Sequence, residues 1–109
     1  MKNIQNKLNN NLKIVYSDNN SISIVFPNND LLMGVLGEFN NNLKELENIT
    51  GSSIYFRGNS IITKNNSKKN EIIKNAIQFL SDQFLINGSI EKKDIISSVN
   101  KFMINENTE

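Results

Sequence analysis

The chain has 109 residues, 38% of them hydrophobic, which is enough for one small domain with a single core. It contains no Cys and no His, so disulfides, thiolate metal sites and histidine-based catalysis are excluded. The formal net charge is +1, so the domain is not basic as a whole, and any contact with nucleic acid has to come from a local patch.

We expect residues 1–20 to form a flexible or partly ordered N-terminal segment. Its start is polar and lacks the apolar stretch of a signal peptide, and no apolar run in the chain approaches the roughly 18 residues of a membrane span. We therefore expect a cytoplasmic protein without a membrane partner. Within this segment, residues 12–16 are either a strand or a lead-in to one.

Apolar and polar side chains alternate over residues 21–26, which predicts a half-buried strand that ends at Pro27. Asn28 then offers an N-cap oxygen for a short helix over residues 31–36. Gly37 interrupts this helix, and a second helix is predicted over residues 38–50. Four apolar residues of the second helix follow each other at helical spacing and predict one buried stripe, formed by Phe39, Leu43, Leu46 and Ile49.

Two short β-prone runs, residues 52–56 and 60–63, flank Arg57-Gly58-Asn59 and predict a hairpin. A long helix is predicted over residues 68–86, followed by a last helix over residues 90–103 that Ser89 caps. The order β-α-α-β-β-α-α predicts an α+β fold, a three-stranded sheet with helices packed on one face. We expect one domain over residues 21–104 and a tail over residues 105–109.

Nothing in the chain specifies an active site. The carboxylates of the second and last helices lie on polar helix sides, and neither phosphate-binding glycine motif, G-x-x-x-x-G-K-[ST] or G-x-G-x-x-G, is present. We therefore expect no catalysis, no metal and no cofactor in this chain.

The spacing of Leu43, Leu46, Thr50-Gly51 and Ile54 resembles that of a K-homology (KH) domain after its glycine loop. That register places the loop at residues 37–40 rather than at the G-x-x-G of residues 34–37. The second loop glycine is then replaced by Asn40, which tolerates a left-handed backbone. The variable pair of the loop, which usually includes a basic residue in this family, is Glu38-Phe39 here, and the Glu38 carboxylate repels a phosphodiester.

A further set of short motifs resembles the N-terminal domain of PhoH-like (phosphate starvation-inducible) proteins over residues 21–103. The matching segments are Phe26-Pro27-Asn28-Asn29, Leu36-Gly37-Glu38, Asn42-Leu43, Leu46-Glu47, Ile54 and Arg57-Gly58-Asn59. The resemblance implies a KH-like RNA-binding domain that precedes a P-loop ATPase domain in a cytoplasmic protein. It also implies ATP and Mg²⁺ for that ATPase domain only, and possible partners in single-stranded RNA, the ATPase domain itself and an rRNA-processing endoribonuclease.

The candidate nucleic-acid-binding residues are Gly37, Glu38, Phe39, Asn40, Arg57, Lys64, Lys68 and Lys69. Arg57 either contacts phosphate or a neighbouring domain, or bonds loop carbonyls or a helix carboxylate. The lysines, together with Lys74, form either a phosphate-binding cluster or a solvated helix face. Phe39 either stacks a base or joins the core stripe. Two functions stay open: an RNA-binding module, or a protein-interaction domain that positions an ATPase without contacting RNA.

Overall fold

The computed structural model of the chain describes residues 10–107. The expectations for residues 1–9 and 108–109 lie outside the described residues. The elements follow the predicted order, with one more strand at the start. They are β2 (Lys13–Ser17), β3 (Ser21–Val25), α1 (Asn29–Leu36), a short 3-10 turn η1 (Glu38–Asn40), α2 (Asn41–Thr50), β4 (Ile54–Arg57), β5 (Ser60–Lys64), α3 (Ser67–Asn87) and α4 (Lys92–Asn107).

The strands form one antiparallel sheet in the order β2-β3-β5-β4. The prediction of three strands was therefore wrong, because β2 pairs with β3 along its whole length, from Lys13 opposite Val25 to Ser17 opposite Ser21. Of the two interpretations of residues 12–16, the strand is correct. The tail assignment also changes, because α4 continues to Asn107.

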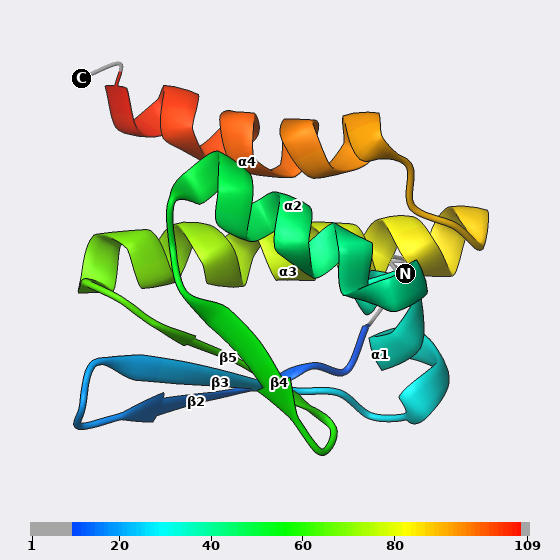
Figure 1. Ribbon diagram of the computed structural model, residues 1–109, viewed down its shortest axis with the longest axis horizontal. Coiled ribbons are helices and arrows are strands. Elements are labelled where there is room, and N and C mark those ends of the chain that lie inside the picture. Colours follow the sequence, from blue (N-terminus) through cyan, green and yellow to red (C-terminus); the bar gives the residue numbers. More distant parts are fainter. Residues whose placement is uncertain (1–9, 108–109) are drawn as a thin grey trace, which may run out of the picture.

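The helices form two layers on one side of the sheet, as Figure 1 shows. α2 and α3 lie against the sheet, and α1 packs on α2 and α3 beside one end of it. α4 lies across α2 and α3 on the side away from the sheet. This confirms the α+β class with helices on one face. The largest fully buried side chains come from both layers and the sheet, among them Phe26, Ile24, Leu32, Leu46, Ile61, Ile73, Leu80 and Val99.

Local signals set most helix ends. The Asn28 side chain accepts a hydrogen bond from Leu31 N at 2.9 Å, and the Asn66 side chain accepts one from Lys69 N at 2.8 Å, so both act as N-caps. Gly51 ends α2 in the left-handed conformation predicted for it. α4 starts later than predicted, since Ser89 does not cap it.

Hydrogen bonds between Glu91 and Asp94 cap the N-terminus of α4 instead. Asp94 N donates to Glu91 O, while the Asp94 carboxylate accepts a hydrogen bond from Glu91 N at 2.8 Å. The bond from Glu91 N to the Asp94 carboxylate is one half of a capping box, with aspartate in the place of the usual glutamate, while Asp94 N bonds the Glu91 backbone instead of its side chain. The sequence prediction missed it because Ser89 is the stronger single-residue signal.

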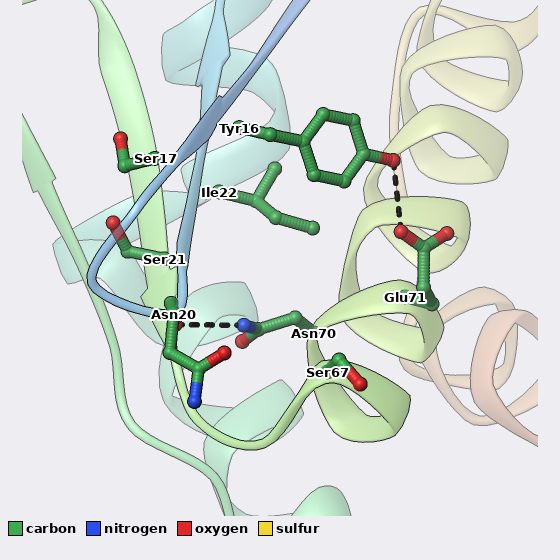
Figure 2. A pocket seen from close by; sticks show the side chains of 8 residues that line it. All are labelled: Tyr16, Ser17, Asn20, Ser21, Ile22, Ser67, Asn70 and Glu71. Atoms are coloured by element: carbon green, nitrogen blue, oxygen red, sulfur yellow. Dashed lines mark hydrogen bonds between the residues drawn. The ribbon is translucent and has the colours of Figure 1, made fainter.

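A buried asparagine holds the β2–β3 turn and β5 to α3, and Figure 2 shows its bond to the turn. Asn70 is 2% exposed, and its Nδ2 donates to Asn20 O at 2.9 Å. Its Oδ1 accepts hydrogen bonds from Thr63 Oγ1 and from Asn65 N, both at 3.0 Å. One side chain therefore satisfies polar groups on three separate segments of the chain.

A second link between sheet and α3 is charged and more exposed. Tyr16 Oη donates to Glu71 Oε2 at 2.8 Å, and Lys74 Nζ lies 2.9 Å from Glu71 Oε1 (Figure 2 shows the Tyr16 bond). The hydrogen bond from Lys74 is the main reason that the pKa of Glu71 is lowered, with Tyr16 adding to it against partial burial. For Lys74 partial burial acts to lower the pKa, but the bonds to Glu71 and Tyr16 together leave it raised.

Glu71→Gln should lower the free energy of unfolding at neutral pH by less than about 1 kcal/mol, since the carboxylate is 44% exposed and screened by solvent. Because the folded-state pKa of Glu71 is lowered, its contribution is present above the ordinary glutamate pKa of about 4.3 and is lost as the pH falls through the lowered value. Urea unfolding of both proteins at pH 7 and pH 3 checks this. A difference that persists or grows at pH 3 would contradict it.

Candidate functional site

The loop between α1 and α2 has the backbone expected of a tight turn between two helices. Gly37, Phe39 and Asn40 have positive φ values of 78°, 53° and 59°. Gly34, by contrast, lies inside α1, where a Cβ would stand 2.5 Å from the Phe84 ring. The turn between the two helices is therefore at residues 37–40, and Gly34 allows close packing of α1 on Phe84.

Phe39 does not belong to the core stripe. Its side chain is 82% exposed, whereas Leu43 is 5% and Leu46 is 1% exposed. The prediction of a helix from residue 38 was wrong, because the left-handed residues Phe39 and Asn40 precede α2 and break the helical phase. An exposed aromatic ring stands at this loop as a result.

A groove of about 250 Å³ runs between α2 and the edge strand β4, and the loop closes one end of it. In Figure 1, β4 returns from the end of α2 toward the loop side of the molecule. Leu43 and Ile54 line the groove and are each 5% exposed, so they are its apolar floor. Tyr55 and Phe56, 43% and 42% exposed, line its outer side.

The groove lining contains one cation and one anion, and the anion is engaged in a hydrogen bond within the domain. Lys44 lines the groove and forms no ion pair with the side chains that the structure describes, those of residues 10–101. Glu47 also lines it, but its Oε2 accepts a hydrogen bond from Ile54 N at 3.0 Å, so that carboxylate is occupied in holding β4 to α2. Glu38 lines a different cavity, on the α1 and α3 side of the loop.

The lysines predicted to form one cluster lie at different places on the surface. Lys69 Nζ donates to Gly51 O at 3.3 Å, which puts it at the end of α2 opposite the loop. Since α2 has ten residues and is about 15 Å long, loop and Lys69 lie at opposite ends of the same helix. Lys68 precedes it in the first turn of α3, whereas Lys74 is paired with Glu71.

Arg57 and Lys64 end strands β4 and β5, and neither lines the groove. Within the described residues, the Arg57 guanidinium makes none of the bonds to loop carbonyls or a carboxylate that its structural role required. Asn59 does have the structural role, because its N and O groups bond Phe26: Asn59 Nδ2 donates to Phe26 O at 3.3 Å and Phe26 N donates to Asn59 O at 2.9 Å.

Two other hollows are less suited to binding. The cavity drawn in Figure 2, about 70 Å³ between the β2–β3 turn and α3, has room for a few water molecules only. A wider hollow of about 470 Å³ lies between α1, the loop and the end of α3, where Met33 is 53% exposed. It has no basic residue in its lining.

Two groove residues, Lys44 and Phe56, were missed from the sequence, and Tyr55 was considered for base stacking but could not be assigned to a strand face. Helical phase could have placed Lys44 beside the buried Leu43, and an alternation count over β4 could have separated Tyr55 from Ile54. That β4 is the edge strand beside α2 had no local signal.

Comparisons with protein-family models, with curated proteins and with solved structures found no match to this chain. The PhoH-like resemblance therefore remains a prediction. Among the helices of the described part of the chain, none has both the length and the apolar character needed to cross a bilayer.

Proposed function

We propose that this domain is a KH-like module that binds single-stranded RNA in the groove between α2 and β4. The observation that carries the proposal is the groove itself, with an apolar floor, exposed aromatic rings beside it and a lysine at its rim. Its volume of about 250 Å³ is just below the range of small-molecule pockets, about 300–1,000 Å³, and suits part of an extended ligand.

The roles follow from the chemistry of the side chains. A base that enters the groove covers Leu43 and Ile54 and can stack on Tyr55 or Phe56, as single-stranded RNA does on exposed aromatic rings. Phe39 offers a further platform at the loop. The phosphates lie toward Lys44 on one side and toward Lys68 and Lys69 at the far end of α2.

The same proposal includes the relationship of this domain to the N-terminal domain of PhoH-like proteins. The element order after β2, β-α-α-β-β-α, is compatible with a KH-like domain, and the motifs quoted for the PhoH-like resemblance include Leu36-Gly37-Glu38 of the loop and the Arg57-Gly58-Asn59 turn. On this proposal the domain works in the cytoplasm, attached to a P-loop ATPase domain that supplies the nucleotide chemistry.

Fluorescence anisotropy of a labelled single-stranded RNA tests the proposal. The wild-type domain should bind saturably at low salt and more weakly at moderate salt. Tyr55→Ala should weaken binding by about 5- to 150-fold, since a stacked base contributes about 1–3 kcal/mol. Lys44→Glu should weaken it as well, because it places a second carboxylate beside Glu47.

Lys93→Glu is the matched control for Lys44→Glu, because it makes the same charge change on α4 at a side chain that is 80% exposed and does not line the groove. It should leave RNA affinity unchanged. Lys68→Glu with Lys69→Glu tests the far end of the groove and should weaken binding. Absence of RNA binding at low salt by the wild-type domain would overturn the proposal.

The second candidate function, a domain that positions an ATPase through protein contacts, has one observation in its favour. Apolar side chains are exposed near the 470 Å³ hollow and the end of α3, where Met33 is 53%, Leu85 43% and Ile86 62% exposed. Met33→Asp with Ile86→Asp separates the two candidates: it should leave RNA affinity unchanged if the groove is the binding site, and should disrupt association if the domain acts through protein contacts.

A further inference from the structure

The sheet has a second face that no helix covers within residues 10–107 (Figure 1). Side chains alternate between the two faces along each strand. The face toward the helices carries the buried side chains, which are Ile22, Ile24, Ile54, Ile61 and Thr63. The side chains between them therefore point to the open side. In the two outer strands these include Lys13, Val15, Tyr55 and Arg57, and in the two central strands Ser23, Val25, Ser60, Ile62 and Lys64.

The charge on this face is of one sign. Its ionisable side chains are Lys13, Arg57 and Lys64, all exposed, and none of the four strands contains an Asp or Glu. No ion pair within the described residues involves any of the three cations. Since the whole chain carries only +1, these unpaired charges are concentrated on one surface of a nearly neutral domain.

The strand register fixes how the cations are spaced. Lys13 pairs with Val25, Val25 with Ser60 and Ser60 with Arg57, so one row of the sheet has a cation at each outer strand. Three strand spacings separate these two cations, about 14 Å. Lys64 lies four residues along β5 from Ser60, which is about 13 Å from that row.

An uncharged row lies between the cations. Val15 pairs with Ser23, Ser23 with Ile62 and Ile62 with Tyr55, so this row ends at an aromatic ring on the edge strand β4. Tyr55 also lines the groove between α2 and β4. The groove and the open face therefore meet at the same tyrosine.

We propose that the open face of the sheet is a second binding segment for the same single-stranded nucleic acid, which leaves the groove across β4 at Tyr55 and places its phosphates at Arg57, Lys64 and Lys13. The inference rests on the proposed RNA-binding function and extends its footprint. Widely spaced cations with an apolar row between them suit a chain that carries a phosphate at every residue and a base that can cover Ile62 and Tyr55.

Two RNA lengths separate this inference from the proposed function. An oligonucleotide of about four residues can occupy the groove alone, and one of about 12 can also reach the open face. For the wild-type domain, we expect the longer RNA to bind at least about tenfold more tightly at low salt and with a steeper dependence of log K on log salt. Anisotropy titrations at several salt concentrations measure both quantities.

The test variant is Lys13→Gln with Arg57→Gln and Lys64→Gln. For the longer RNA the salt slope should fall by about 2, since each single-strand phosphate contact contributes about 0.7 and three are lost. The affinity for the short RNA should not change. The control, Lys92→Gln with Lys93→Gln and Lys101→Gln, removes the same charge from α4 and should alter neither RNA.

The outcomes are distinct. If the short RNA binds but the longer RNA gains nothing, or if the open-face variant behaves like the α4 control, the inference is wrong and the groove function stands. If the open-face variant weakens both lengths equally, the cations act by general attraction and the second segment is again excluded. If neither RNA binds the wild-type domain, the proposed function fails and this inference fails with it.

Discussion

Replacing Asn70 with Ala should lower the free energy of unfolding by about 3 kcal/mol. The substitution removes the acceptor for Thr63 Oγ1 and Asn65 N and the donor to Asn20 O, and Thr63 is fully buried. Each buried polar group left without a partner costs about 1–3 kcal/mol. A domain of this size has about 5–15 kcal/mol of stability in total, so the change is a large fraction of it.

The measurement is urea unfolding, in which the midpoint should fall while the slope m stays constant. Asn75→Ala is the matched control, because Asn75 lies in the same helix and makes no hydrogen bond of this kind within the described residues. Its replacement should be neutral or slightly stabilising, since Ala has the higher helix propensity. Equal effects of the two substitutions would mean that the Asn70 network does not hold the turn to α3 in solution.

Local chemistry made most of the helices predictable. α1 and α3 begin beside the asparagines that cap them, Asn28 and Asn66, and α2 ends at Gly51, which adopts the left-handed conformation. These signals act within a few residues, so a single sequence contains them. The alternation of residues 21–26 worked for the same reason, because β3 is central and one of its faces is buried.

Some predictions failed because the local structure depends on contacts or backbone angles that the sequence pattern does not reveal. β2 has a weak pattern because it is an outer strand with mostly exposed side chains, and pairing with β3 fixes it. Phe39 continues the apolar spacing of α2, yet the backbone at Phe39 and Asn40 turns left-handed before the helix begins. Periodicity alone does not reveal a break of helical phase.

In the candidate site too, features set by local sequence could be predicted and features set by long-range pairing could not. Residues 37–40 could be located from the spacing of the apolar residues that follow them. The groove could not, because Lys44 on α2 and Tyr55 on β4 come together only when β4 takes the edge of the sheet beside α2. Likewise, Lys13 and Arg57 become one charged row only through three successive strand registers. Sheet order is set by the whole core rather than by any one segment.

Val99→Asp should lower the free energy of unfolding by about 3–5 kcal/mol. Val99 is fully buried where α4 lies on α2 and α3, and Ile95 one turn earlier is 2% exposed (Figure 1). A carboxylate at this position has no cation to pair with among the core residues around it. An uncompensated buried charge costs several kcal/mol, so α4 must detach or the domain must unfold.

Ile96→Asp on the same helix is the control, because its side chain is 40% exposed and its replacement should cost less than about 1 kcal/mol. Urea unfolding followed by far-UV circular dichroism compares the two variants. A large effect at Val99 and a small one at Ile96 would establish that α4 is part of the cooperative unit. Similar small effects would instead mean that α4 is only loosely docked, and that the sheet with α1, α2 and α3 folds without it.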